Sequence, residues 1–171
     1  TLNFSYGARK MVPGTGLFLN NEMDDFVSKA DIPNAYGLVG SRYNEIAPEK
    51  RMLSSMTPTI LTKNNTFFMA TGSPGGSRII TTTLQLILNV CTFDMTIAEA
   101  TYASRIHHQW LPDILFIERG LSPDTDSLLT KKGHVLRETR AMGSTQSIVF
   151  IHNRLHGSSD PRKPGALTVG Y

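Results

Sequence analysis

The stretch that decides the fold is a corner with the sequence Thr71-Gly72-Ser73-Pro74-Gly75-Gly76-Ser77-Arg78. It joins an apolar, strand-like run at 67–70 to a helix-like run at 79–90. Pro74 fixes φ and lacks an N–H, whereas Gly75 and Gly76 can adopt backbone angles that other residues avoid. Their N–H groups can therefore face a ligand, and the unpaired amides that open the next helix favour a negative charge beside them. The pattern predicts an oxyanion hole or a phosphate site, with a tight turn that binds nothing as the alternative.

Composition predicts one soluble globular domain over residues 1–171, with 40% hydrophobic and 18% charged residues. No apolar run is long enough to predict a membrane span. The net charge of +3 comes from 17 basic and 14 acidic residues that are scattered, so we expect no nucleic-acid partner. We interpret the basic pairs Arg9-Lys10, Lys131-Lys132 and Arg162-Lys163 as solvated surface. The single cysteine, Cys91, excludes an internal disulfide and is predicted to be a buried, inert thiol.

Periodicity predicts strands at 1–6 and 17–19, then a long loop at about 27–50. Loops of this length are often lids or binding loops, and this one carries an aromatic residue, Tyr36. A hairpin is predicted from 59–62 and 66–70, and it leads into the glycine corner.

Helix signals follow the corner. Five apolar residues at helical spacing predict one buried face: Ile80, Leu84, Ile87, Leu88 and Cys91. Thr96 and Glu99 form a capping box for a second helix through Ala103. Ser122 and Pro123 begin a third helix that ends at Gly133. Strands are predicted at 114–117, 135–139 and 147–151, followed by a Gly/Pro-rich tail. This order of strands and helices favours an α+β layered sandwich.

The histidines do not predict a metal site. Adjacent residues such as His107 and His108 point in different directions, so this pair is expected to fix its own segment by hydrogen bonding. His152 and His156 follow a strand rather than lying on a helix. Cys91 is not at a helix N-terminus, where a thiolate would be stabilised. We therefore expect no metal and no cofactor.

Four polar clusters border apolar segments: Thr1 with Asn3, Glu22 with Asp25, Ser54 with Ser55, and Gly75 with Gly76. Carboxylates suit an ammonium group, hydroxyls with turn amides suit a carboxylate, and glycine amides suit a developing oxyanion. Together the clusters predict an α-amino-acid pocket beside an acyl-transfer centre. Taken singly, each is also explained as a turn, a cap or a loop hydroxyl.

Several longer motifs carry a resemblance to a known family. They are Asn20-Asn21-Glu22-Met23-Asp24-Asp25-Phe26, Pro33-Asn34-Ala35-Tyr36-Gly37-Leu38-Val39-Gly40, Lys50-Arg51-Met52-Leu53-Ser54-Ser55-Met56-Thr57-Pro58, the corner itself, His107-His108-Gln109-Trp110-Leu111-Pro112 and Ala141-Met142-Gly143-Ser144-Thr145-Gln146. These motifs closely resemble the small subunit of the γ-glutamyltransferases, also called glutathione hydrolases. The resemblance spans nearly the whole chain.

The resemblance implies a four-layer αββα sandwich of the N-terminal-nucleophile hydrolase type, completed by a large subunit from the same self-cleaving precursor. It implies an enzyme that cleaves the γ-glutamyl amide of glutathione and related compounds through a γ-glutamyl-Thr acyl-enzyme, which passes to water or to an amino acid or peptide. A non-catalytic homologue that binds γ-glutamyl compounds is the alternative. A bacterial, periplasmic or secreted setting is also implied.

The resemblance assigns roles to individual residues. Gly75 and Gly76 match the oxyanion-hole donors. The other matches concern the substrate: Ser54 and Ser55 for the α-carboxylate, Asp25, Glu22 and Asn3 around the α-amino group, and Tyr36 as the tip of a lid. Thr1 matches a second threonine that hydrogen-bonds the nucleophile, so the nucleophilic threonine is expected outside these residues.

Overall fold

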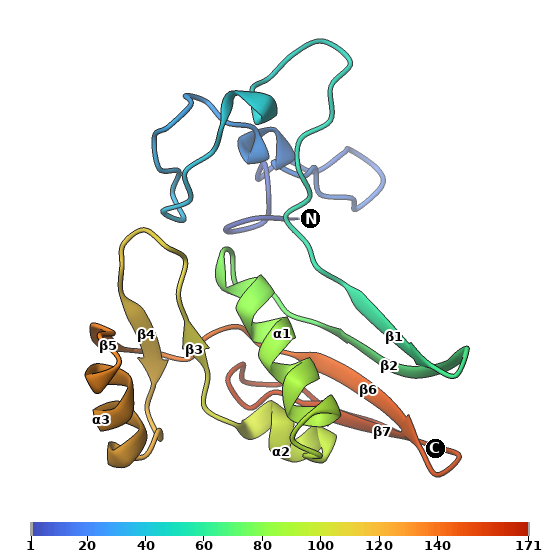
Figure 1. The fold of residues 1–171 in the computed structure, drawn as a ribbon. Coiled ribbons are helices and arrows are strands. Elements are labelled where there is room, and N and C mark those ends of the chain that lie inside the picture. Colours follow the sequence, from blue (N-terminus) through green and yellow to red (C-terminus); the bar gives the residue numbers. More distant parts are fainter. Residues whose placement is uncertain (1, 171) are drawn as a thin grey trace. The chain divides into compact units, whose positions relative to one another are not determined.

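The computed structural model describes residues 2–170, which form two compact units (Figure 1). The first unit is Thr1–Met56 and the second is Thr57–Tyr171. A single domain over 1–171 stays a prediction. Thr1, for which a role at the nucleophile is expected, lies outside the described residues.

The first unit consists mainly of turns. Its helical segments are two short 3₁₀ turns, η1 (Glu22–Asp25) and η2 (Arg42–Asn44). The predicted strand at 1–6 is wrong in its described part, because Phe4 and Tyr6 have positive φ and the segment folds into turns. The predicted strand at 17–19 is reduced to one isolated bridge, between Met11 and Phe18. Alternating residues alone do not make a strand when no partner strand extends beside them.

The second unit is built around a four-stranded antiparallel sheet with the order β1-β2-β6-β7. Its strands are β1 (Thr59–Lys63), β2 (Thr66–Gly72), β6 (Gln146–Ile151) and β7 (Arg154–Ser159). The predicted hairpin of β1 and β2 is confirmed. Its turn residues, Asn64 and Asn65, both have positive φ, as two-residue hairpin turns require. The edge strand β7 was not predicted, because it holds glycine and serine rather than β-branched residues.

Two helices lie against one face of this sheet (Figure 1): α1 (Arg78–Cys91) and α2 (Ile97–Tyr102). The hydrophobic core between the layers comprises Met69, Leu86, Val90, Ile97, Ala100 and Val149. Met69 and Val149 are register partners on β2 and β6, so one cross-strand pair lies at the core. The capping box of α2 is confirmed, with Thr96 and Glu99 bonding reciprocally.

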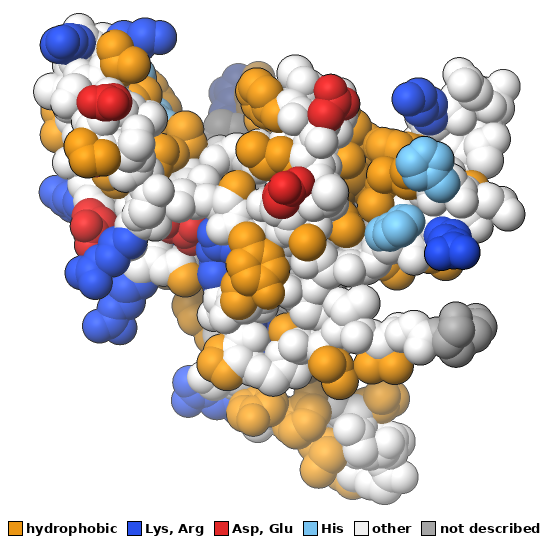
Figure 2. All heavy atoms as spheres, turned by 90° about the horizontal axis from the view of Figure 1, so that it is seen from below, with side chains coloured by type: hydrophobic (Ala, Val, Ile, Leu, Met, Phe, Trp, Pro, Cys, Tyr) orange, Lys and Arg blue, Asp and Glu red, His pale blue; other side chains and the backbone are white. Residues whose placement is uncertain are grey.

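The predicted buried face of α1 is wrong. Ile80, Leu84 and Leu88 are exposed, and Cys91 is exposed rather than buried. The side chains that α1 buries are instead Thr82, Thr83, Leu86 and Val90. The apolar stripe of α1 therefore faces outward from the core of this unit. Exposed hydrophobic side chains are also visible among polar ones in Figure 2.

A second, three-stranded sheet has the order β3-β4-β5. It contains β3 (Ile106–His107), β4 (Leu115–Glu118) and β5 (Leu136–Thr139). β4 and β5 are parallel and are connected through α3 (Pro123–Lys131), whose predicted cap at Ser122 is confirmed. β3 was not predicted, because it is only two residues long.

The predicted α+β class is confirmed by these two sheets and three helices. The chain supplies a helix layer on a sheet layer, which is half of a four-layer sandwich. Within residues 2–170, no helix is both long and apolar enough to cross a membrane.

The capping box gives a stability prediction. Thr96→Ala removes the acceptor for the Glu99 amide, so we expect the free energy of unfolding to fall by about 1 kcal/mol. Thr92→Ala is the control, because Thr92 is an exposed residue just past α1. Urea unfolding of both variants measures the difference. Equal midpoints would show that the capping box does not stabilise α2.

Candidate active site

The glycine corner lies between β2 and α1. Gly75 and Gly76 have φ of +144° and +58°, in the region that favours glycine. The carbonyl oxygens of Gly75 and Gly76 accept from the amides of Arg78 and Ile79, each at 3.1 Å. Within residues 2–170, no acceptor bonds to the N–H of either glycine. Both amides are therefore available to stabilise an oxyanion.

In the first unit, two of the residues predicted for a head-group site, Asn3 and Asp25, are hydrogen-bonded to each other. The Asn3 side-chain amide donates to Asp25 Oδ1 at 3.4 Å, and the Asn3 backbone amide donates to Asn21 Oδ1 at 3.0 Å. Glu22 opens η1, and its amide donates to Asn20 Oδ1 at 3.1 Å. Three of the predicted residues thus belong to one hydrogen-bonded segment around η1.

Asn44, which the sequence did not single out, links this segment to the predicted serine pair. Its side-chain nitrogen donates to the Asp25 carbonyl at 2.7 Å, and its Oδ1 accepts from the Leu53 amide at 3.1 Å. Leu53 directly precedes Ser54. Asn44 therefore links the backbone at Asp25 to the backbone just before Ser54. The sequence did not mark this residue, because an asparagine in a long loop is not a specific signal.

Two side-chain atoms in this unit are buried without a hydrogen-bond partner among the described residues: Asp25 Oδ2 and Ser55 Oγ. Unpaired buried polar atoms are costly, so they are expected where a ligand or water completes the set. The Ser54 hydroxyl is exposed and bonds to the backbone of Met56 at 3.3 Å. The available atoms are a carboxylate oxygen and a hydroxyl, which match the two ends of an α-amino acid.

Tyr36 lies in an ordered turn of the predicted lid loop. Its ring stacks on Phe4, with centroids 5.5 Å apart and an interplanar angle of 11°. Asn34 Oδ1 accepts from the amides of Tyr36 and Leu38, which holds the turn. Because Phe4 follows Asn3, this turn lies beside the predicted head-group residues.

The two units thus divide the predicted site. Asn3, Glu22, Asp25, Tyr36, Ser54 and Ser55 belong to the first unit, and Gly75 and Gly76 belong to the second. Within the first unit the structure brings the head-group residues into one segment.

A buried charge network in the second unit was missed. Arg105 donates to Asp160 Oδ2 at 2.6 Å, and Arg162 donates to Glu118 Oε2 at 2.6 Å and to Asp160 Oδ1 at 3.2 Å. Side-chain exposure in the network is at most 10%, so the prediction that Arg162 is solvated is wrong. No sequence pattern marks this network, because Arg105, Glu118 and Asp160 lie far apart in the chain.

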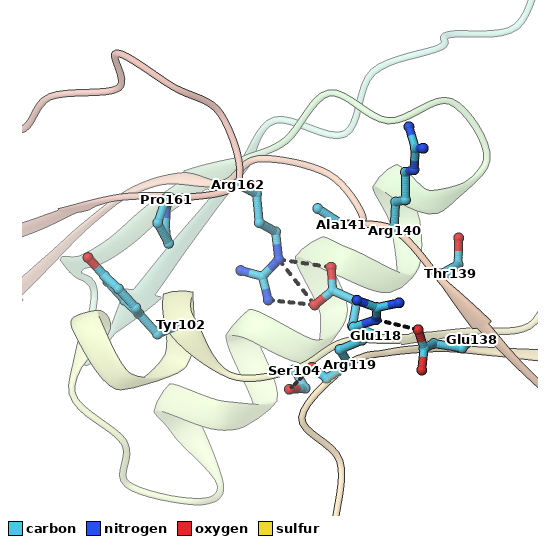
Figure 3. A pocket seen from close by; sticks show the side chains of 10 residues that line it. All are labelled: Tyr102, Ser104, Glu118, Arg119, Glu138, Thr139, Arg140, Ala141, Pro161 and Arg162. Carbon is cyan, nitrogen blue, oxygen red and sulfur yellow. Dashed lines mark hydrogen bonds and ion pairs between the residues drawn. The ribbon is translucent and has the colours of Figure 1, made fainter.

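This network forms one wall of a cavity of about 830 Å³ (Figure 3). The lining residues are Tyr102, Ser104, Glu118, Arg119, Glu138, Thr139, Arg140, Ala141, Pro161 and Arg162. The guanidinium of Arg162 is fully occupied by Glu118, Asp160 and the carbonyls of Thr101 and Ala103. The charge of Arg162 on the cavity wall is therefore already paired, and the residues that line the cavity do not include the glycine corner.

Burial and pairing oppose each other in this network. Burial raises the pKa of Glu118 and Asp160, but hydrogen bonds from arginine side chains and backbone amides outweigh it, and both pKa values end below normal. Burial lowers the pKa of Arg105. Burial also opposes the charged form of Arg162, but pairing with Glu118 and Asp160 outweighs it and raises the pKa of Arg162. Both carboxylates are therefore ionised at neutral pH.

The histidine pair has the structural role that the sequence predicts. His107 Nδ1 lies 2.8 Å from Thr81 Oγ1 on α1, and His107 Nε2 lies 2.9 Å from Gln109 Oε1. Burial lowers the pKa of His107. His108 Nε2 lies 3.0 Å from Asp113. Among residues 2–170, no three His, Cys, Asp or Glu side chains are placed to hold a metal ion.

Known proteins resemble this chain in sequence and in fold. A family model described as Gamma-glutamyltranspeptidase matches residues 1–170. The chain is 52% identical over its full length to the Glutathione hydrolase proenzyme of Escherichia coli, of which it covers 30%, and 43% identical to that of Pseudomonas sp., of which it covers 32%. The chain thus spans about a third of the length of these relatives. A solved mutant of Helicobacter pylori gamma-glutamyltranspeptidase is 50% identical, with a TM-score of 0.88 over 95% of this chain and 90% of that one.

The buried network predicts acid-sensitive stability. Glu118→Gln removes the closer of the two carboxylates that pair with Arg162 and leaves Asp160 as the remaining one, so we expect a loss of about 3–5 kcal/mol in the free energy of unfolding at pH 7. Glu138→Gln is the control, because Glu138 is exposed and pairs with Arg119; we expect a loss below about 1 kcal/mol.

The pH dependence follows from the lowered pKa of Glu118. Its contribution is present above the ordinary glutamate pKa of about 4.3 and is lost as the pH falls through the lower folded value. The gap between wild type and Glu118→Gln should therefore narrow as the pH falls below about 4. A gap that stays constant from pH 7 to pH 2 in urea unfolding would contradict this account.

Proposed function

This chain belongs to the gamma-glutamyltranspeptidase family, and from this premise we propose that it forms the catalytic small-subunit portion of an enzyme for γ-glutamyl transfer and hydrolysis. The observation that carries the proposal is the pair of unengaged amides at Gly75 and Gly76, in a chain that matches the family over its full length. The substrate class is a γ-glutamyl amide such as glutathione, the compound after which the relatives are named.

The reaction is an acyl transfer. A threonine hydroxyl outside residues 1–171 attacks the γ-carbonyl carbon, and its own α-amino group takes the proton. The carbonyl oxygen becomes an oxyanion that accepts hydrogen bonds from Gly75 and Gly76. Collapse of this intermediate breaks the amide bond, and the leaving amine takes the proton. Water or an acceptor amine then attacks the γ-glutamyl ester by the same steps and frees the threonine. Thr1 is assigned a hydrogen bond to the nucleophile.

Recognition of the glutamyl head group is assigned to the first unit. Asp25, Glu22 and Asn3 supply oxygen acceptors and negative charge for the α-ammonium group. Ser54 and Ser55 supply hydroxyl donors for the α-carboxylate. The unpaired Asp25 Oδ2 and Ser55 Oγ support these assignments, because a bound glutamyl group would pair both. Tyr36 is assigned to cover the bound group.

A large subunit from the same precursor is the proposed partner. The curated relatives are named proenzymes and are about three times as long as this chain. The outward apolar stripe of α1, at Ile80, Leu84 and Leu88, supports a covering by further polypeptide, since such stripes often mark interfaces. We also propose a periplasmic or secreted location, on the resemblance to bacterial members, and cell fractionation tests it.

The oxyanion role predicts a large loss of turnover in Gly76→Val. Valine disfavours φ of +58°, so the corner must shift and its amides leave the reacting oxygen. We expect kcat for a γ-glutamyl anilide to fall by about 100- to 1,000-fold.

Gly133→Val is the matched control, because Gly133 also has positive φ but ends α3 and faces open space. We expect its kcat to stay within about threefold of the wild-type value, which is a change of less than about 1.36 kcal/mol in the activation free energy. Wild-type protein that binds the anilide without turnover would instead indicate the non-catalytic alternative.

Asp25→Asn should weaken substrate binding. Losing a charged acceptor for the ammonium group costs about 1.5–3 kcal/mol, so we expect KM to rise by about 10- to 150-fold. Asp24→Asn is the control, since Asp24 lies in the same turn and is exposed. An analogue without the α-amino group should bind wild type and Asp25→Asn equally. If Asp25→Asn still binds the substrate more tightly than the analogue, by the same factor as wild type, the ammonium group binds elsewhere.

A further inference from the structure

We propose that Ser73 is a positioning residue that orients the Gly75 amide through a clasp with the segment 142–145, here called the strap. This inference rests on the proposed function, because it concerns how the oxyanion donors are held. The strap connects β5 to β6, and that connection runs past the start of α1 (Figure 1).

The Ser73 hydroxyl makes two hydrogen bonds in the clasp. It accepts from the amide of Ser144, in the strap, at 2.9 Å, and it donates to the carbonyl of Pro74 at 2.7 Å. The Pro74 carbonyl and the Gly75 N–H belong to one planar peptide group, in which the two bonds point in opposite directions. Holding the Pro74 carbonyl therefore fixes the direction of the Gly75 N–H.

Steric contact makes the clasp tight. Gly143 has a φ of +67°, and a Cβ added there would lie 2.6 Å from Ser73 Oγ and 3.0 Å from a methyl carbon of Thr82. A Cβ on Gly75 would lie 3.4 Å from Gly143 Cα. The two loops approach at van der Waals distance, and only glycine at 143 leaves room for the serine hydroxyl.

The strap itself is held on both sides by the buried charge network. The Met142 carbonyl accepts from Arg105 at 2.6 Å, and the Met142 amide donates to Glu118. On the other side, the Thr145 amide donates to Asp160 at 2.8 Å. Met142 and Thr145 are almost fully buried. The clasp therefore links the Gly75 peptide, through the strap, to the buried charge network.

The test uses the full-length, matured enzyme and a γ-glutamyl anilide. Ser73→Ala removes both hydrogen bonds, and we expect kcat to fall by about tenfold or more with KM nearly unchanged, because the oxyanion forms only on the way to reaction. Ser144→Ala is the matched control, since it keeps the backbone amide that Ser73 uses. Ser73→Thr keeps a hydroxyl and should recover most of the lost kcat.

A double-mutant cycle isolates the contact. Gly143→Ala brings a methyl group against the Ser73 hydroxyl, and Ser73→Ala removes that hydroxyl. The pair should therefore lose less kcat than the product of the single losses. Losses that simply multiply would overturn the clasp, as would a Ser73→Ala enzyme with wild-type kcat.

Hydrogen exchange separates this inference from the proposed function. Ser73→Ala should speed amide exchange in peptides covering 72–80, and Ser144→Ala should not. Faster exchange in Ser73→Ala, together with a wild type that has no turnover, would refute the proposed function and keep the clasp. An active wild type with unchanged exchange and kcat in Ser73→Ala would refute the clasp alone.

Discussion

The structure depends on a constraint at one peptide corner, where a strand must become a helix while two N–H groups stay unpaired. Helix starts always leave amides without internal partners, and most proteins satisfy them with a capping side chain or water. At this corner Ser77 precedes α1 but makes no side-chain cap bond. Gly75 and Gly76 use their carbonyls within the turn and keep their amides free. Such preorganised donors stabilise a developing charge without rearranging at the moment of reaction.

Keeping donors free is costly, so the surrounding structure must hold the corner in place. The buried ion pairs of Asp160 and Glu118 help the surrounding structure to hold the corner. Buried pairs contribute little net stability compared with apolar packing, yet breaking one is severe, so their main effect is to fix geometry. Here they fix backbone groups on both sides of Gly143, which contacts the corner.

The features that the sequence predicts correctly depend on local signals. The hairpin turn at Asn64 and Asn65 and the caps of α2 and α3 are written in a few adjacent residues. The predictions of burial were wrong where burial depends on residues that are distant in the sequence. The outward face of α1 is the more apolar one, whereas Thr82 and Thr83 pack inward, so a count of hydrophobic residues selects the wrong side. The sequence indicated a surface position for Arg162, because its partner Glu118 is 44 residues away in the chain. The predicted site residues came from residue chemistry and from long motifs; the structure then added the linking residue, Asn44, which neither had suggested.

The central claim is that the Gly75 and Gly76 amides receive the charge of the attacked carbonyl. The most direct measurement is a crystal structure of the matured enzyme with a tetrahedral γ-glutamyl analogue bonded to its nucleophile. The account predicts that both amide nitrogens lie about 2.7–3.1 Å from the analogue's oxygen. An analogue oxygen held by other donors, with the two amides bonded to protein or solvent, would contradict it.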